Sequence, residues 1–199
     1  MFYSGGPLCY NKGQTAASPA RNGKRKVGNM EIERKFLLKE MPREDQLPQG
    51  WQPAGRAQVW QGYLYFLAPV VRIRYRIKDD GTEDWKLCIK GPGTLARAEV
   101  ETPLTRQQYE ELCAMLPIPP VKKEFACYRL PDGRLLECSR VDPESPRIFC
   151  YAEVEFASEQ EARDFVPPPQ LGRDVTEEPY YAMASYWSRK LLWFKNYEE

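Results

Sequence analysis

The segment Glu31-Ile32-Glu33-Arg34-Lys35 places two carboxylates and an ammonium at alternate positions. In a β-strand, residues two apart point to the same side of the sheet, so Glu31, Glu33 and Lys35 would share one face. Carboxylate oxygens suit Mg²⁺ or Mn²⁺, and an ammonium suits a phosphate group. This strand predicts a site for a divalent cation beside a polyanion, although the same pattern also occurs on solvated strand faces.

The alternation of charge recurs in four later segments, and the recurrence favours a site over a solvated face. The repeated faces consist of Arg72, Arg74 and Arg76; Lys86, Cys88 and Lys90; Arg97, Glu99 and Glu101; and Glu153 with Glu155. Charge at every second place in five strands is typical of the wall of a polar lumen. A closed barrel gives such side chains a wet interior while its outside packs on helices.

The elements that must position these faces are mainly strands. Alternating residues predict eight strands, and the turn signals at 79–81 and 131–133 predict two hairpins. The expected strands span residues 31–38, 57–66, 70–78, 83–90, 97–104, 122–130, 134–140 and 149–157.

Three helices are expected to accompany the strands. The first lies near 105–116 with Thr105 as its cap, the second begins at Ser158 and ends before three consecutive prolines, and the third spans about 180–195. The apolar stripe of the third helix consists of Ala184, Trp187, Leu191 and Phe194. We expect this stripe to pack against the exterior of the barrel.

Composition narrows the chemistry. The chain has 199 residues, 42% of them hydrophobic and 29% charged, which suits one globular domain with a sizeable core. It contains no histidine, which excludes Ser-His and Cys-His triads and every His-ligated metal site. Any proton transfer must therefore use Glu, Asp, Lys, Tyr or metal-bound water.

Charge and cysteine distribution set the expected organisation. Residues 1–29 carry five basic and no acidic residues and lack periodicity, which predicts a disordered basic extension before a single domain at 30–199. The acidic balance of that domain argues against nucleic-acid binding.

The absence of a long apolar run or signal core predicts a cytoplasmic protein without a membrane span. Six scattered cysteines indicate reduced thiols. The oligomeric state stays open, a homodimer included.

Taken in order, the motifs resemble the CYTH family, the triphosphate tunnel metalloenzymes, and the short bacterial inorganic-triphosphatase branch in particular. The likeness covers most of residues 30–185 and rests on Glu31-x-Glu33-x-Lys35, Gln61-Gly62-Tyr63-Leu64, Val71-Arg72-Ile73-Arg74, Ile89-Lys90-Gly91, Arg97-x-Glu99-x-Glu101, Leu130-Pro131-Asp132-Gly133, Glu153-Val154-Glu155-Phe156 and Asp174-Val175-Thr176. The resemblance implies an α+β fold with an eight-stranded antiparallel tunnel and helices packed outside. It also implies dependence on Mg²⁺ or Mn²⁺ and a linear triphosphate substrate.

The resemblance and the charge pattern together suggest roles for individual residues. Basic residues on facing walls would hold the phosphate oxygens, with Lys35, Arg72, Arg74, Lys86, Lys90, Arg97 and Lys123 as candidates, Lys86 and Lys90 being alternatives. The expected metal ligands are Glu31, Glu33, Glu153 and Glu155. Glu99 and Glu101 would hold a second ion or orient the attacking water. Lys35 and Tyr63 match a Lys–Tyr pair implicated in selecting tripolyphosphate, although Tyr63 could equally be a buried aromatic.

Three positions depart from the family pattern. Phe125 stands where the family has an arginine, Ser139 where it has an aspartate, and the segment around Tyr180 lacks a usual basic residue. Loss of one transition-state contact typically costs about 2.7–4 kcal/mol, so three losses could leave a slow enzyme or a tunnel that only binds.

Several functions therefore stay open. The sequence favours metal-dependent hydrolysis of inorganic tripolyphosphate to pyrophosphate and phosphate. The alternatives are another triphosphate reaction, such as thiamine triphosphate hydrolysis or cyclisation of ATP, and a non-catalytic polyphosphate- or nucleotide-binding module. A barrel whose charges only pair with one another is the least favoured, because clusters of like charge are costly without a ligand.

Overall fold

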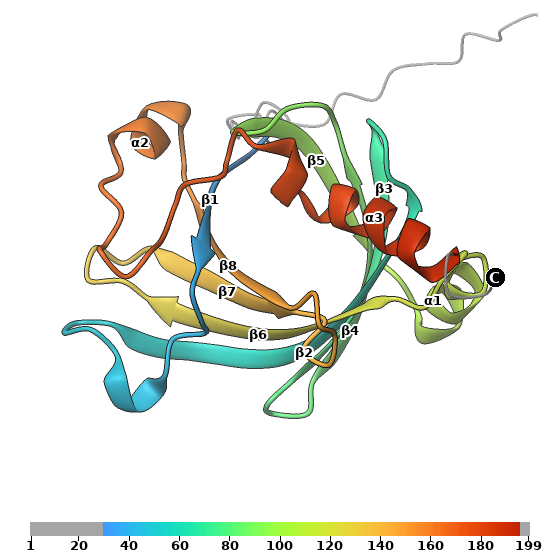
Figure 1. The fold of residues 1–199 in the computed structure, drawn as a ribbon, viewed down its shortest axis with the longest axis horizontal. Coiled ribbons are helices and arrows are strands. Elements are labelled where there is room, and N and C mark those ends of the chain that lie inside the picture. Colours follow the sequence, from blue (N-terminus) through green and yellow to red (C-terminus); the bar gives the residue numbers. More distant parts are fainter. Residues whose placement is uncertain (1–29, 196–199) are drawn as a thin grey trace, which may run out of the picture.

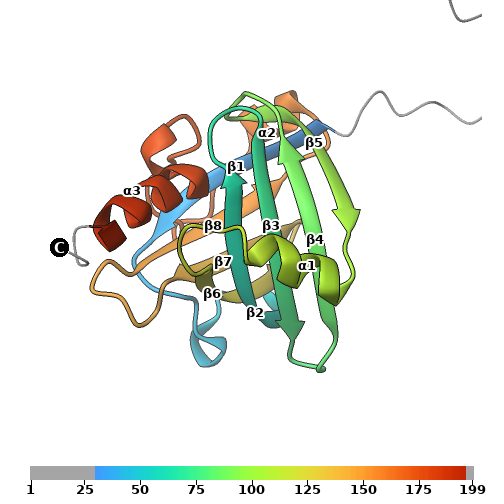
Figure 2. The ribbon, with the colours of Figure 1, turned by 90° about the vertical axis from the view of Figure 1, so that its right-hand side faces the viewer.

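Eight antiparallel strands form a closed barrel in the computed structural model, which describes residues 30–195 (Figures 1 and 2). The strands are β1 (Met30–Leu38), β2 (Gln52–Tyr65), β3 (Val70–Lys78), β4 (Glu83–Lys90), β5 (Ala96–Pro103), β6 (Val121–Arg129), β7 (Leu135–Val141) and β8 (Phe149–Glu155). Around the barrel their order is β1-β5-β4-β3-β2-β6-β7-β8. The predicted eight-stranded antiparallel barrel with helices is confirmed, while the predicted basic extension at 1–29 lies outside the described residues.

The strand β2 is longer at its start than the sequence predicts. It begins at Gln52 rather than near residue 57 and pairs with β6 from that point, with an irregularity in register between Pro53 and Gly55. Gly55 adopts a φ of 137°, a conformation that L side chains rarely adopt. Pro and Gly are turn signals in sequence, but here they mark a bulge that lets the strand continue.

The register of the barrel brings the alternating charged faces to the inside. Glu33 pairs with Glu155 across β1 and β8, and Lys90 pairs with Glu99 across β4 and β5. β1 closes the barrel because it pairs with β5 on one side and β8 on the other. Alternation along each strand then sends the residues between these charged positions outward.

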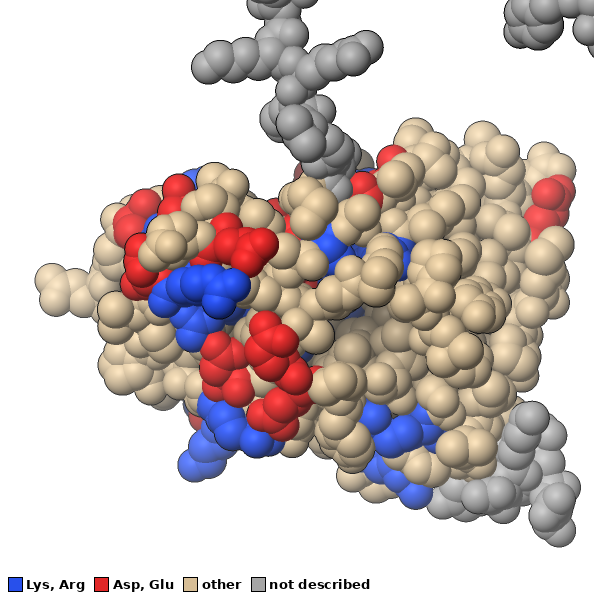
Figure 3. Space-filling model, turned by 90° about the horizontal axis from the view of Figure 1, so that it is seen from above, with Lys and Arg blue, Asp and Glu red and all other residues tan. Residues whose placement is uncertain are grey.

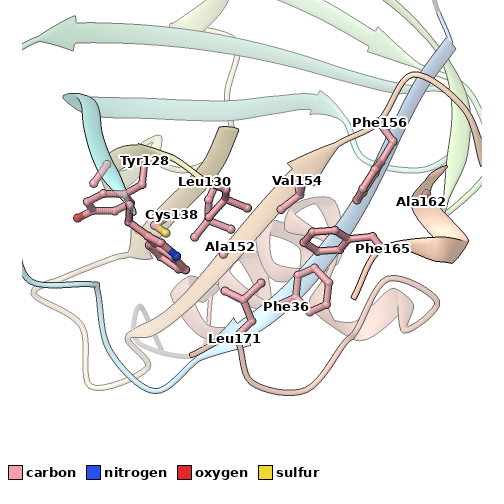
Figure 4. Packing of buried hydrophobic residues seen from close by; sticks show 13 residues of the cluster. Phe36, Tyr128, Leu130, Cys138, Ala152, Val154, Phe156, Ala162, Phe165 and Leu171 are labelled. Carbon is pink, nitrogen blue, oxygen red and sulfur yellow. The ribbon is translucent and has the colours of Figure 1, made fainter. Parts of the chain in front are cut away.

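A hydrophobic core covers the outer face of β1, β6, β7 and β8 (Figure 4). Phe165 follows helix α2 (Glu159–Asp164), and its ring lies 6.2 Å from that of Phe36 and 5.2 Å from that of Phe156, measured between centroids. Ser158 caps α2 as predicted, because its hydroxyl accepts from the backbone N–H of Glu161. This helix therefore packs outside the barrel, as the sequence analysis expected.

Helix α1 (Arg106–Cys113) also lies outside the barrel, against β3 and β4. Its cap is the predicted Thr105, which forms a capping box with Gln108. The Tyr109 ring lies 6.0 Å from the Tyr75 ring, which attaches the helix to the outward face of β3.

Helix α3 (Met183–Lys195) covers one end of the barrel, not its exterior as predicted (Figure 1). A 3₁₀ turn at Pro179–Tyr181 precedes it, so the α-helix begins later than residue 180. Trp187 is fully buried against inward-facing side chains of β2, β6, β7 and β8, whereas Phe194 is 40% exposed. The apolar stripe thus packs into the barrel end through Ala184, Trp187 and Leu191, but not through Phe194. No helix among residues 30–195 is long and apolar enough to cross a membrane.

Candidate functional site

The barrel encloses a polar cavity of about 680 Å³. Eight basic and eight acidic residues line it, together with the loops at 66–70 and 91–94 and the segment before and at the start of α3. From above, the surface is hollowed between clusters of both charge signs (Figure 3). Every residue that the sequence analysis proposed for the site lines this cavity, namely Glu31, Glu33, Lys35, Tyr63, Arg72, Arg74, Lys86, Lys90, Arg97, Glu99, Glu101, Lys123, Glu153 and Glu155. We refer to this cavity as the tunnel.

Glu31 is the centre of one group of charges in the tunnel. Lys90 Nζ lies 2.5 and 2.6 Å from its two carboxylate oxygens, and Arg97 Nε donates to it at 2.8 Å. Burial alone would raise the pKa of Glu31, but the charges of Lys90 and Arg97 outweigh burial and lower it to about 2. Arg97 also donates to Glu33 at 2.7 Å, so one guanidinium joins both acids of the first motif.

Glu101 contacts basic residues of two neighbouring strands, β3 and β4. Lys86 Nζ donates to it at 2.6 Å, and guanidinium nitrogens of Arg72 and Arg74 each lie 3.4 Å from the same carboxylate oxygen. The Nε atoms of Arg72 and Arg74 are buried and have no hydrogen-bond partner among the described residues. Buried donors without an acceptor are costly, so this wall of the tunnel can accept an anion.

Lys35 and Lys123 meet at a tyrosine that the sequence analysis did not single out. Lys35 Nζ lies 2.9 Å from a carboxylate oxygen of Glu153 and 4.3 Å from the centroid of the Tyr151 ring. Lys123 Nζ donates to the Tyr151 hydroxyl at 3.0 Å. Burial lowers the pKa of Lys123 to about 7; the Glu153 charge opposes this shift, and the Arg72 charge adds to it.

The structure does not join Lys35 and Tyr63 by a hydrogen bond. The Tyr63 hydroxyl accepts from Gln61 Nε2 at 2.6 Å, and both residues are buried. Burial raises the pKa of Tyr63 well above its ordinary range, so its hydroxyl stays protonated. The Tyr63 ring packs 5.8 Å from that of Trp187 in α3, which favours the interpretation as a buried aromatic, although the residue is part of the tunnel lining.

Three acids on β1, β7 and β8 provide a test of whether the tunnel suits a divalent cation. Glu137 and Glu155 have no basic group within 4.0 Å among the described residues, and burial followed by neighbouring carboxylates raises the pKa of each. Burial and the charge of Glu153 raise the pKa of Glu33 to about 7, even though Arg97 donates to it. Carboxylates that raise one another's pKa suit Mg²⁺ or Mn²⁺ by ligand type, since such an ion would relieve their repulsion.

A second group of ligand-type atoms fits these ions less well. One atom each of Cys88, Glu99 and Glu101 lies within 4.8 Å of the others. The Cys88 thiol donates to Glu99 at 2.8 Å, and burial raises its pKa to about 11, so it is protonated. A thiol is a soft ligand, and Glu101 already binds three basic groups. The carboxylates on β1, β7 and β8 are the better match by ligand type, although among the described residues only the atoms of Cys88, Glu99 and Glu101 come within 4.8 Å of one another as a group of three.

Two of the three departures from the family pattern are neighbours in space. Phe125 on β6 and Ser139 on β7 are direct cross-strand partners, and both line the tunnel. A basic and an acidic residue at these positions would be able to form an ion pair. Their joint replacement therefore leaves the net charge of the tunnel unchanged, so it counts as one local change and not as two independent losses.

The third departure lies at the tunnel mouth. Tyr180 is exposed, and the guanidinium of Arg189 lies 3.8 Å from its ring centroid. The backbone carbonyl of Tyr181 accepts from Lys35 Nζ at 3.4 Å. The segment without the usual basic residue thus still contacts Lys35 of β1, through its backbone.

Sequence reasoning missed three residues that line the tunnel with consequences for its chemistry. Arg76 was not among the proposed phosphate-binding residues, but it lines the tunnel and donates to Asp84 at 2.7 Å. Glu137 and Tyr151 were not proposed at all. Alternation offered a signal for both, since Glu137 and Ser139 share a face, as do Tyr151 and Glu153.

The fold and the charged tunnel define a class of proteins, and the chain belongs to it: residues 29–174 match the CYTH domain family. An inorganic triphosphatase from Nitrosomonas europaea is 35% identical over 152 residues, which cover 76% of this chain and 92% of the relative. A crystal structure of an inorganic triphosphatase superposes with a TM-score of 0.51 and 30% identity, covering 78% of this chain and 93% of the other. A second solved structure, described as a hypothetical protein, gives 0.50 and 31% identity over 78% and 96% of the two chains.

Proposed function

We propose that the chain hydrolyses inorganic tripolyphosphate to pyrophosphate and phosphate inside the tunnel. The observation that carries the proposal is the set of basic side chains around the tunnel, in which the buried Nε–H groups of Arg72 and Arg74 have no acceptor among residues 30–195. Similarity to an inorganic triphosphatase over most of both chains supports the same activity. A linear triphosphate supplies several anionic oxygens that can bridge such walls.

Basic residues of the tunnel are proposed to bind the substrate from both sides. Arg72, Arg74 and Lys86 would grip one part of the phosphate chain, and Lys35 and Lys123 another, with Lys90 and Arg97 near Glu31 between the acids and the substrate. Each ion pair with a carboxylate can exchange that carboxylate for a phosphate oxygen. The oxygen of water then bonds to the terminal phosphorus as the bridging P–O bond breaks, and pyrophosphate leaves.

The acids of β1, β7 and β8 are proposed to hold a divalent cation, Mg²⁺ or Mn²⁺. Glu33, Glu153 and Glu155, three of the four expected ligands, would supply oxygen atoms. Glu31 lies on the same face of β1 as Glu33, and Glu137 would extend the set. When bound, such an ion would neutralise charge on the phosphoryl group. Glu99 and Glu101 hold Arg72, Lys86 and Lys90 on the basic wall, so we assign them to positioning those groups.

The test is phosphate release from tripolyphosphate, with ATP, thiamine triphosphate and pyrophosphate in parallel, in Mg²⁺, Mn²⁺ or EDTA. We expect metal-dependent release that prefers tripolyphosphate. Glu33→Gln should lower kcat/KM about 100-fold or more. Losses of this size are typical when a group that helps hold a metal ion or stabilises transition-state charge is removed. Glu124→Gln is the matched control, since Glu124 pairs with Arg140 at 3.0 Å away from the tunnel. Folded wild-type protein that binds tripolyphosphate without releasing phosphate would instead indicate a binding module.

A further inference from the structure

Tyr151 on β8 lies between two ammonium groups that come from opposite sides of the strand pair β7–β8. Its hydroxyl accepts from Lys123 Nζ of β6 at 3.0 Å, and its ring centroid lies 4.3 Å from Lys35 Nζ of β1. β1 and β6 are not neighbours in the barrel, because β7 and β8 separate them. Tyr151 is 1% exposed, so packing fixes its ring and the positions of both contacts.

Lys123 differs from the other basic residues of the tunnel in its partner. The other seven lie within 4.0 Å of a carboxylate, whereas Lys123 has only the neutral hydroxyl of Tyr151 among the described residues. The charged groups that interact with Lys123 are Glu153, Arg72, Arg74, Lys35 and Glu137, and none of the acids among them lies within 4.0 Å. An ammonium with a neutral partner can bind an anion without first breaking an ion pair.

The residue beside Tyr151 on the neighbouring strand β7 is uncharged. Ser139 on β7 is the cross-strand partner of Tyr151 and also of Phe125 on β6. An acidic residue at position 139 would stand diagonal to Lys123 on the adjacent strand, within reach of a long side chain. It would offer Lys123 a carboxylate and so compete with an anionic ligand. The row Phe125–Ser139–Tyr151 contains no such competitor.

We propose that Tyr151 is a positioning residue that holds Lys35 and Lys123 as a two-point clamp for one terminal phosphoryl group of a linear triphosphate. The proposal rests on the function proposed above and deepens it. The hydroxyl fixes the ammonium of Lys123, and the ring face limits where the ammonium of Lys35 can lie. With both lysines protonated the clamp carries two positive charges, and Glu153 neutralises only one of them at short range.

The test compares Tyr151→Phe, Lys123→Gln and the double variant with the wild type, by calorimetric titration of tripolyphosphate in EDTA and in Mg²⁺. Tyr151→Phe keeps the ring over Lys35 and removes only the hydroxyl. We expect its Kd for tripolyphosphate to rise about tenfold, the size typical of a lost hydrogen bond to a charged group. KM should rise by a similar factor, while kcat changes about twofold or less. Because Tyr151 acts through Lys123, the double variant should bind no worse than Lys123→Gln alone.

Tyr128→Phe is the matched control. Tyr128 is as buried as Tyr151, and its hydroxyl also makes a hydrogen bond, to the carbonyl of Pro42 at 2.8 Å, but it lies in the outer core. Both Tyr→Phe variants should lower Tm, and only Tyr151→Phe should weaken binding.

The outcomes separate the two proposals. Wild-type affinity in Tyr151→Phe, or additive losses in the double variant, would overturn the clamp while leaving the proposed function standing. A wild-type protein that binds no tripolyphosphate under either condition would overturn both. If Tyr151→Phe fails to fold, an unchanged Kd in Lys123→Gln overturns the clamp by itself, and a raised Kd supports it.

Discussion

Glu31 shows at the scale of one residue how the tunnel keeps charges stable away from bulk water. Burial opposes ionisation of its carboxylate, yet Lys90 and Arg97 lie close enough to reverse the effect. Removing one member of a buried pair leaves an uncompensated charge and typically costs about 3–5 kcal/mol. The charged residues of the tunnel are therefore mutually dependent, and single substitutions there are expected to affect stability as well as activity.

Asp174 offers a cleaner test of electrostatics because it lies outside the tunnel. Burial would raise its pKa, but hydrogen bonds from Thr176 and from Arg34 lower it. Arg34 binds Asp174 through two nitrogens, at 2.9 and 2.6 Å, and also donates to the carbonyls of Ala162 and Phe165. This one guanidinium thus connects β1, α2 and the segment that follows it.

We predict that Asp174→Asn destabilises the protein near pH 7 and has little effect near pH 2. The pKa of Asp174 is lower in the folded than in the unfolded chain, so its contribution is present above the unfolded value and lost as pH falls through the folded value. The side chain is 36% exposed, so we discount for solvent screening and expect about 1 kcal/mol. Urea denaturation of both proteins between pH 2 and 7 checks this. A difference that stays constant with pH would contradict the assignment.

At the scale of elements, α3 determines which end of the tunnel is apolar. Trp187 packs with Tyr63, Val121, Val141 and Tyr151, all of them inward-facing residues of the barrel. Tyr186 and Lys190 of α3 both donate to Asp142 at 2.7 Å, which anchors the helix at the end of β7. The helix therefore supports the two tyrosines whose hydroxyls face the substrate-binding residues.

Trp187→Ala is expected to lower the free energy of unfolding by about 3–5 kcal/mol, since a fully buried Trp leaves a large cavity. Phe194→Ala, on the exposed part of the same helix, should change it by about 0.5 kcal/mol or less. Thermal or urea denaturation measures both. Equal effects of the two substitutions would show that α3 does not close the barrel end as described.

The packing partner of α3 could not be predicted from the sequence. Alternation identified all eight strands and their inward faces, and capping residues identified the helix starts at Thr105 and Ser158. Both kinds of signal are local in sequence. The stripe on α3 showed that one side is apolar, but the partner of that side depends on barrel closure. A period of 3.6 residues does not distinguish a helix on the outside of a barrel from one across its end.

Site residues were predictable where a local pattern identified them, and not where their role depends on other strands. Members of repeated charged faces were found because every second residue carries charge. Alternation could have placed Tyr151 and Glu137 on inward faces, but their interactions depend on other strands, with Lys123 and Lys35 for the first and with Glu153 and Glu155 for the second. The neighbouring positions of Phe125 and Ser139 likewise follow from strand register, which the sequence does not specify over long separations.

For the molecule as a whole, the near balance of basic and acidic residues in the tunnel links the binding of an anion to the binding of a cation. Most basic groups already bind a carboxylate, so a triphosphate must replace that partner. Each replacement frees a carboxylate, which then needs a cation of its own. Binding of the anion and of a divalent cation should therefore favour each other.

We accordingly predict that Mg²⁺ tightens tripolyphosphate binding by about 5- to 150-fold, the usual range of coupling between two ligands. Calorimetric Kd values with and without Mg²⁺, corrected for the complex that the two form in solution, provide the measurement. Glu33→Gln should reduce the coupling more than it reduces affinity in EDTA. Equal affinities with and without Mg²⁺ would argue that the acids serve only as partners of the basic groups.

Closure of the barrel by β1 has a consequence for how the chain reaches this state. The first strand finds one partner in β5 and the other in β8, the last strand to be synthesised. Until β8 is available, most of β1 has no strand to pair with, and its alternating apolar face stays uncovered. Pairing at such sequence separation slows folding and exposes strand edges to other chains. We expect β1 to be the last strand to gain protection from hydrogen exchange during refolding, although it is the first to be made.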